Sequence, residues 1–276
     1  MSHLVSAPRS LRVGAAASLC AAGIAACAFY LALPDVRPLA RSFPRRTGLI
    51  ELRVREGLPR DRVRYAPVPL DRISPHLVRA VLVAEDASFY RHRGVDWVEL
   101  RDAIRDALAR RRPLRGASTL TQQLARTLYL SPARHLGRKL AEFAIARRLE
   151  RALGKRRILE LYLSAVEWGP GLFGAEAAAR AYFGVSASDL DPVQAALLAA
   201  TLPHPLTANP ARNPERLRWR AGLILRRMGV ATARPEAPTD SLGPVPEMAP
   251  ASADSPTGGA AEAADTVPTS EPGGAP

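Results

Sequence analysis

Uncharged, mostly apolar residues form one long run near the start of the chain. The segment Val13–Leu33 has 21 residues and no charge. As a helix with a rise of 1.5 Å per residue, it would cross a hydrocarbon layer about 30 Å thick. The run therefore predicts one N-terminal transmembrane helix. Because it is rich in alanine, a cleaved signal peptide and a lipoprotein signal that leaves Cys27 acylated stay open as alternatives.

Arginines lie on both sides of this segment. Arg9 and Arg12 precede it, and four more follow it at positions 37, 41, 45 and 46. Positive charge accumulates on the cytoplasmic side of a membrane span. The arginine count therefore does not favour a cytoplasmic N-terminus.

Helix start and stop signals recur along the middle of the chain. A capping side chain stands before a proline, which suits the first helical turn, at Ser74, Ser131, Asp191 and Asn213. Glycines that suit helix ends stand at positions 154, 184 and 229. The pattern predicts a mainly α fold.

These signals divide the chain into five parts. Residues 1–12 are an N-terminal tail, 13–33 the anchor, 34–70 a connector rich in proline and arginine, and 71–231 the main helical domain. Within the connector, the alternation from Leu49 to Val54 is typical of a strand. The last part, 232–276, should be disordered, because its final 43 residues include nine prolines and few residues that could form a core.

Charge is distributed unevenly between these parts. The chain carries +13, but its last 43 residues have seven acidic residues and one basic residue, so residues 1–233 carry +19. Such an excess favours an anionic partner: a nucleic acid, a phospholipid surface or a phosphorylated substrate. Both cysteines, Cys20 and Cys27, lie in the apolar run, so the rest of the chain has no disulfide framework or thiolate metal site.

Two adjacent acids end an apolar stretch in the first group of candidate residues. Glu85 and Asp86 follow Val81–Ala84 and precede Phe89, His92 and Gly94. A carboxylate at the end of a buried helix can lie in a cleft with a raised pKa, as a general base requires. The alternative is an exposed acidic pair at a helix end. We assign His92 a structural role.

Small hydroxyls and amides form the second group, which follows the basic stretch Arg110–Arg115. It runs from Gly116 to Arg126 and includes Ser118 and Thr119. Hydroxyl, amide and guanidinium groups suit phosphate and sugar oxygens. The same residues also fit a helix start capped by Ser118 or Thr119, and a helix start is itself an anion site.

A basic pair and an acid form the third group. In a helix, Arg138 and Glu142 share one face at i, i+4, with Lys139 beside them. The simplest interpretation is a solvated ion pair. However, the chain has 37 arginines and only two lysines, so Lys139 departs from a strong bias and indicates a need for a compact ammonium group.

Taken in chain order, these groups resemble the motifs of the peptidoglycan glycosyltransferase family, the lipid II polymerases of bacterial cell walls. The segments at 85–94, 116–123 and 138–142 match E-D-x-x-F-x-x-H-x-G, G-x-S-T-x-T-Q-Q and R-K-x-x-E. A fourth match begins at Lys155 and a fifth at Arg220. Because the predicted disordered tail begins near residue 232, we expect the monofunctional form. Arg126–Thr127 and Ser164 depart from the family's usual Lys-Asn and Asn.

The resemblance implies a fold and a reaction. The fold is a lysozyme-like helical head with a small membrane-proximal lobe, to which the segment from Arg101 to Arg115 would belong. The donor is a growing glycan on undecaprenyl pyrophosphate, and the acceptor is the GlcNAc 4-hydroxyl of lipid II. A single displacement inverts the α-linked donor to a β-1,4 product.

The resemblance also implies roles for individual residues. Glu85 is the general base, and Glu142 is a second carboxylate that orients cations or holds a divalent ion such as Mg²⁺ or Mn²⁺. No organic cofactor is implied. The residues implied to bind substrate are Ser118, Thr119, Gln122, Gln123, Arg126, Arg134, Arg138 and Lys139. Those implied to complete the motifs structurally are Asp86, Phe89, His92, Gly94, Gly116, Lys155, Glu160 and Tyr162.

Location and partners follow from the same resemblance. Lipid II is polymerised outside the bacterial inner membrane, so we expect a single-pass protein with its catalytic domain in the periplasm, against the arginine count. The expected partners are lipid II, the polyprenyl-pyrophosphate glycan, an anionic membrane surface, and cell-division or wall-synthesis proteins, but no nucleic acid.

Two other functions are considered. A lytic transglycosylase or muramidase is also lysozyme-like and needs an essential Glu, but it has no pyrophosphate to bind and no use for Arg138–Lys139. A basic membrane-anchored scaffold explains the charge but not Gln122–Gln123 or Glu85–Asp86.

Overall fold

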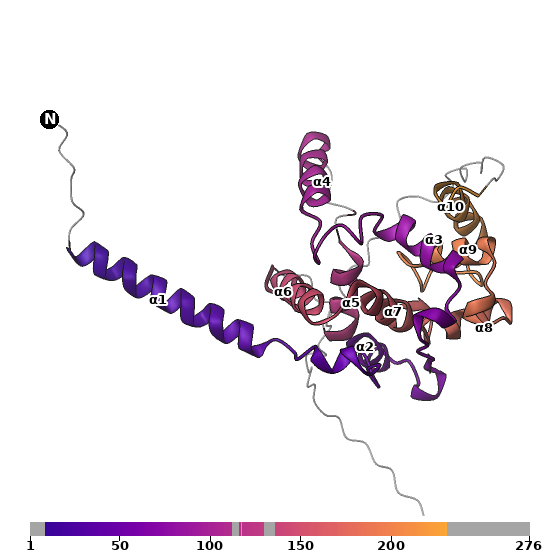
Figure 1. Ribbon diagram of the computed structural model, residues 1–276, viewed down its shortest axis with the longest axis horizontal. Helices are drawn as coiled ribbons and strands as arrows, with labels where there is room; N and C mark the ends of the chain where they lie inside the picture. The colour runs from indigo at the N-terminus through magenta and orange to yellow at the C-terminus, as the bar shows by residue number, and fades with distance from the viewer. Residues whose placement is uncertain (1–8, 112–115, 117, 130–135, 231–276) are drawn as a thin grey trace, which may run out of the picture. The chain divides into compact units, whose positions relative to one another are not determined.

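The computed structural model describes residues 9–111, 116, 118–129 and 136–230 (Figure 1). Helices dominate this part of the chain, which confirms the predicted mainly α fold. The α-helices are α1 (Arg9–Ala32), α2 (Gly48–Arg55), α3 (Pro75–Glu85), α4 (Trp97–Arg110), α5 (Leu120–Tyr129), α6 (Leu136–Ala152), α7 (Lys155–Ala165), α8 (Ala175–Phe183), α9 (Pro192–Thr201) and α10 (Pro214–Arg227). Four 3₁₀ turns are η1 (Arg37–Ala40), η2 (Arg60–Arg62), η3 (Leu70–Arg72) and η4 (Ala187–Asp189).

Local caps fix several of these helix starts. The Ser74 hydroxyl accepts from the His76 amide at the start of α3, and Asp191 forms a reciprocal capping box with Gln194 in α9. Both starts are as predicted. Asn213 precedes α10 but has a left-handed backbone and makes no side-chain cap, and Ser131 lies outside the described residues.

The predicted strand from Leu49 to Val54 is wrong, because this segment lies within α2. The Thr47 hydroxyl accepts from the Ile50 amide at 3.1 Å and starts the helix there. Ile50 is buried, and a Cβ on Gly48 would lie 3.1 Å from the Leu128 carbonyl oxygen. Glycine therefore lets α2 approach the backbone of α5 closely.

A small sheet joins distant parts of the chain. Its strands are β1 (Arg64–Tyr65), β2 (Glu167–Gly169) and β3 (Leu172–Phe173), in the order β1-β3-β2. β1 is parallel to β3, and β2 is antiparallel to β3 with an irregularity in register. The sheet thereby fixes the segment before α3 to the turn before α8.

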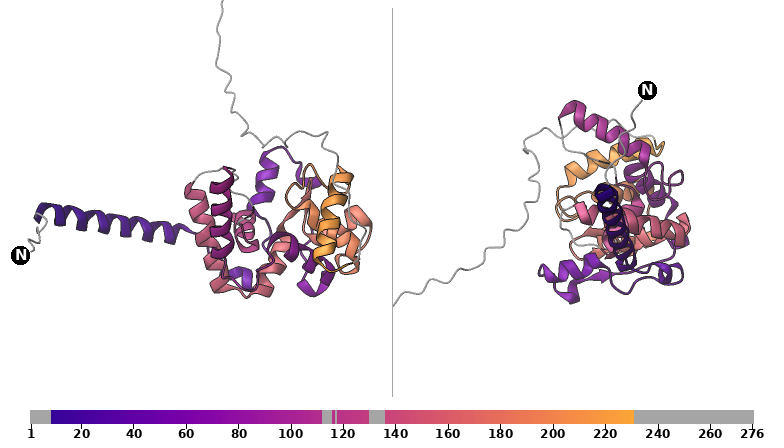
Figure 2. Two further views of the ribbon diagram at one scale, coloured as in Figure 1. Left: turned by 90° about the horizontal axis from the view of Figure 1, so that it is seen from above. Right: turned by 90° about the vertical axis from the view of Figure 1, so that its left-hand side faces the viewer.

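The core positions the two helix ends that matter for the site. α5 packs between α6 and α7 (Figure 1), while α3 packs on α9 and α10, which lie side by side in orange to yellow in Figure 2. Leu120 and Leu124 of α5 and Tyr162 of α7 are fully buried. The C-terminus of α3 and the N-terminus of α5 are consequently held by the same core.

The end of α1 is fastened to α6. The Arg148 guanidinium donates to the carbonyl oxygens of Leu33 at 2.9 Å, Pro34 at 3.2 Å and Tyr30. It also lies 4.0 Å from the centre of the Tyr30 ring. These contacts satisfy carbonyl groups at and just beyond the helix C-terminus that have no partner within the helix.

The structure bears on the predicted membrane anchor but not on the predicted disordered tail. Within the described ranges, no helix is both long and apolar enough to cross a membrane. The side chains of α1 are described from Ala17 onward, and Leu19, Ile24 and Leu31 among them are exposed. The predicted disordered segment 232–276 lies outside the described residues, and the predicted domain boundaries stay predictions.

Candidate active site

A pocket of about 1300 Å³ lies where α3 ends. Its walls come from the segment between α3 and α4, the start of α4, the residues before and within α5, and parts of α6 and α10. Candidate residues that line it are Glu85, Asp86, His92, Gly116, Ser118 and Gln123. The pocket therefore brings together members of the first and second predicted groups.

Glu85 is the last residue of α3, and its side chain is 13% exposed. Its carboxylate accepts from Gln123 Nε2 at 3.2 Å and pairs with the Arg220 guanidinium at 3.4 Å. Burial raises the pKa of Glu85, while the Gln123 hydrogen bond and the charges of Arg220 and Arg126 oppose that shift. A carboxylate with a raised pKa is suited to accept a proton near neutral pH.

The side-chain amide of Gln123 is held in place by a hydrogen bond from Tyr162. Its Oε1 accepts from the Tyr162 hydroxyl at 2.9 Å. Tyr162 is fully buried, and burial raises its pKa well above the usual value, so the phenol keeps its proton and donates. This bond turns the amide NH₂ of Gln123 toward Glu85.

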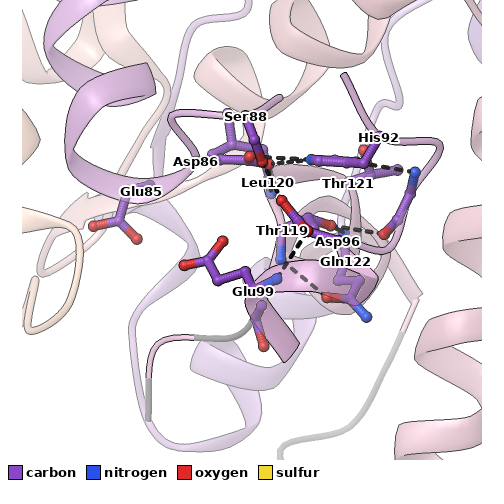
Figure 3. Close-up of polar contacts among 12 residues, drawn as sticks. Glu85, Asp86, Ser88, His92, Asp96, Glu99, Thr119, Leu120, Thr121 and Gln122 are labelled. Carbon is purple, nitrogen blue, oxygen red and sulfur yellow. Dashed lines mark hydrogen bonds and ion pairs between the residues drawn. The ribbon is translucent and has the colours of Figure 1, made fainter. Parts of the chain in front are cut away.

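Asp86 has a different role from its neighbour. Its side chain leaves the end of α3 in another direction (Figure 3) and accepts from the Leu120 amide at 2.9 Å. It also lies 3.0 Å from His92 Nε2, and His92 Nδ1 accepts from the Gly94 amide. Asp86 thus ties the end of α3 to the start of α5, and the structural role of His92 stays a prediction.

Thr119 is the residue that caps α5. Its hydroxyl accepts from the Gln122 amide at 3.3 Å, and its own amide donates to Gln122 Oε1 at 2.9 Å. The same hydroxyl donates to the Gly94 carbonyl oxygen at 2.8 Å. Thr119 and Gln122 are buried and do not line the pocket. Their hydrogen bonds therefore shape the start of α5, and their predicted contact with substrate stays a prediction.

The third group forms a buried ionic cluster. Glu142 is fully buried, and its two oxygens lie 2.7 Å from Arg138 Nη1 and 2.6 Å from Lys139 Nζ. The interpretation as a solvated ion pair is therefore wrong. Lys139 also donates to the Ser118 hydroxyl at 3.2 Å and lies 5.0 Å from the centre of the Phe143 ring. Because Ser118 lines the pocket, it links this cluster to the pocket wall.

Two other cations were predicted to bind substrate with this cluster. Arg126 is exposed on α5, close enough to Glu85 to affect its pKa. Arg134 lies outside the described residues.

The remaining motif residues support the framework. Lys155 pairs with Glu150 at 2.7 Å and lies over the buried Phe89 ring, and Glu160 accepts from the Leu70 amide at 2.7 Å. Gly94 and Gly116 have φ angles of 90° and 80°, in the region that favours glycine. Gly116 lines the pocket, whereas Lys155, Glu160 and Gly94 do not.

Arg220 and Glu99 line the pocket but were not among the predicted site residues. Arg220 pairs with Glu85, and the fifth motif match was a signal that could have identified it. Glu99 extends from α4 into the same pocket (Figure 3), and burial together with the charges of Asp96 and Asp86 raises its pKa. Nothing in the local sequence distinguishes Glu99 from an acid in a first helical turn.

The residues around Glu142 do not fit a divalent ion. Both of its oxygens are engaged by cations. In the part of the chain that the structure describes, no group of three or more His, Cys, Asp or Glu side chains could hold a metal ion.

Comparison with known proteins agrees with the motifs. The family model described as Transglycosylase matches residues 54–229. Proteins named biosynthetic peptidoglycan transglycosylase from Bordetella avium and Azoarcus sp. are 47% and 45% identical over 184 and 195 residues. These matches cover 64% and 70% of this chain, and 75% and 84% of the relatives. The chain belongs to the transglycosylase family.

Proposed function

We propose that the chain is a peptidoglycan glycosyltransferase that transfers a growing glycan from undecaprenyl pyrophosphate to the GlcNAc 4-hydroxyl of lipid II. Family membership and the names of the relatives support the enzyme class. The observation that carries the proposal is the position of Glu85, a mostly buried carboxylate with a raised pKa that lines a pocket large enough for sugars.

In this proposal Glu85 removes the proton from the attacking hydroxyl. Attack at the anomeric carbon of the α-linked donor forms the β-1,4 bond as the bond to the pyrophosphate breaks. Gln123 and Arg220 hold the carboxylate in place. Because Tyr162 fixes the Gln123 amide, the base is oriented before substrate binds.

The leaving pyrophosphate gains negative charge and needs cations near it. Lys139 and Arg138 supply them in this proposal, with Ser118 between the pocket and the Lys139 ammonium. Glu142 fixes both cations through its two oxygens. Arg126 and Arg134 remain proposed contributors to the same donor site.

We also propose that the chain is a single-pass inner-membrane protein with its catalytic domain in the periplasm. The uncharged length of Val13–Leu33 and the exposed apolar side chains of α1 support an anchor. The charge of +19 on residues 1–233 supports contact with anionic lipid headgroups. An anchor also suits a substrate whose lipid tail stays in the bilayer.

Purified full-length chain incubated with labelled lipid II tests the activity. We expect β-1,4-linked glycan strands, separated by gel electrophoresis and digestible by a muramidase. A chain that forms no strands but shortens purified glycan would be a lytic enzyme, and the proposal would be wrong.

Glu142→Gln tests the cation cluster. Loss of the carboxylate leaves Arg138 and Lys139 without their shared partner, so we expect the polymerisation rate to fall by about 100-fold or more. Circular dichroism should show a folded protein. Glu215→Gln, an exposed acid on α10, is the control and should be neutral. A near-neutral Glu142→Gln would remove this cluster from the mechanism.

A further inference from the structure

Three arginines on the pocket wall have no role in the proposed reaction. Arg91 and Arg93 flank His92 in the segment after α3, and Arg147 lies on α6. Among the described residues, none of the three forms an ion pair with a carboxylate. Of the other pocket arginines, Arg220 pairs with Glu85, and Arg227 donates to the Val83 carbonyl oxygen at 3.4 Å.

A close backbone approach brings Arg93 and Arg147 together, and Arg91 lines the same pocket. Gly94 has φ of 90°, and a Cβ there would lie 3.2 Å from the Ala146 carbonyl oxygen and 3.1 Å from Glu150 Cγ. The loop after α3 therefore lies directly on α6. As a result, Arg147 Nη1 donates to the Arg93 carbonyl oxygen at 3.4 Å.

Among the described residues, the acidic side chains of the pocket form no ion pair with these three arginines. Asp86 is engaged by His92 and the Leu120 amide, and Asp96 caps α4 through the Val98 and Glu99 amides. Asp102 pairs with Arg101. Glu99 also lines the pocket and forms no ion pair among the described residues.

Apolar surface adjoins the arginines in the same pocket. Trp97 and Val98 line it and are 65% and 63% exposed. The Trp97 ring stacks on Phe143, with centroids 6.4 Å apart and planes 15° apart. Charged and apolar surfaces therefore meet at the pocket, a combination that suits a lipid with a phosphate headgroup.

We propose that Arg91, Arg93 and Arg147 form a subsite for the phosphate-bearing headgroup of a membrane lipid. Guanidinium groups bind phosphate oxygens through paired hydrogen bonds. This subsite shares no residue with the Arg138–Lys139–Glu142 cluster. Its ligand is either the diphosphate of the acceptor substrate, which rests on the proposed function, or the phosphate of an ordinary anionic phospholipid.

Equilibrium binding tests this subsite independently of catalysis. The full-length chain in neutral detergent micelles is titrated with a fluorescently labelled polyprenyl diphosphate. We expect the triple variant Arg91→Ala, Arg93→Ala and Arg147→Ala to weaken binding about tenfold or more. The effect should persist in a Lys139→Ala background, because the two groups of residues are separate.

A matched control separates a built subsite from general positive charge. Arg151, Arg156 and Arg226 are exposed, lie outside the pocket and have no ion pair among the described residues. Their combined change to alanine removes the same charge and should alter affinity less than twofold. Equal weakening by both triple variants, or none by the first, would overturn the proposal. Thermal melting confirms that each variant is folded.

Competition identifies the source of the phosphate. Phosphatidylglycerol doped into the micelles displaces the probe if the subsite takes ordinary phospholipid headgroups. Displacement by unlabelled polyprenyl diphosphate, but not by phosphatidylglycerol at the same mole fraction, assigns the subsite to the substrate. Because binding requires no turnover, a failure of polymerisation would leave this result intact.

Discussion

Glu85 and Asp86 are consecutive residues with different surroundings. Glu85 is still helical, while Asp86 leaves α3 with an extended backbone at φ of −162°. That turn directs Asp86 into the core, where an amide and an imidazole meet its oxygens. Glu85 instead faces the pocket, where burial raises its pKa. The change in backbone between them separates the structural acid from the proposed base.

The pH dependence of the reaction should report on Arg220. Glu85 acts as a base only when ionised, so kcat/KM should rise with pH through its pKa, which burial places above the usual 4.5. The Arg220 charge lowers this pKa. Arg220→Ala should therefore raise it and move the acidic limb to higher pH.

This shift is measured as kcat/KM against pH over about pH 4 to 8. Arg218→Ala, at an exposed position on the same helix, should leave the limb in place. An acidic limb that stays at the wild-type pH in Arg220→Ala would show that this residue does not act through Glu85.

At the scale of elements, local signals in the sequence predicted helix starts well, but they did not predict contacts between distant helices. Ser74 and Asp191 cap their helices through bonds within three residues, so sequence alone was sufficient. Alternation at Leu49–Val54 predicts a strand, but the Thr47 cap starts a helix there instead. Arg220 meets Glu85 only because α10 packs on α3, a contact that no local pattern records.

The candidate site, too, could be predicted from the sequence only in part. The family motifs predict Glu85, Gln123, Lys139 and Glu142 as site residues, but they do not say which of their neighbours line the pocket. Thr119 has the same hydroxyl chemistry as Ser118, yet only Ser118 lines the pocket. That difference depends on the capping geometry of α5, which places Thr119 in the core.

Asp86→Ala should destabilise the fold. It would leave the buried Leu120 amide without its acceptor and His92 without its partner, at a cost of about 2–3 kcal/mol. Urea unfolding followed by circular dichroism measures the change. Asp61→Ala, at an exposed position, should change the free energy of unfolding by less than about 0.5 kcal/mol. Equal stability of the two variants would contradict the structural role of Asp86.

At the scale of the whole molecule, net charge alone left three classes of anionic partner open. Arg91, Arg93 and Arg147 form no ion pair with any residue that the structure describes, and they line the pocket together with exposed apolar side chains. This combination supports the proposal of a lipid rather than a nucleic acid as partner. The α1 end is held by Arg148 through three carbonyl groups. The predicted anchor would therefore be joined directly to the helix that carries Lys139 and Glu142.

Removal of residues 1–33 tests the anchor. The full chain should stay with membranes in about 1 M salt, where electrostatic attraction is screened. The truncated chain should be released, because only its charge would hold it at the surface. Fractionation and immunoblotting measure both. Release of the full chain by salt would contradict a membrane-spanning segment.

The most direct test of the account compares two acids of one pocket. Wild type, Glu85→Gln and Glu99→Gln are incubated with labelled lipid II, and thermal melting confirms that each is folded. Glu85→Gln should lower polymerisation at least about 1000-fold, because the base is lost, whereas Glu99→Gln should stay within about tenfold of wild type. Glycan strands formed by folded Glu85→Gln at the wild-type rate would contradict the account.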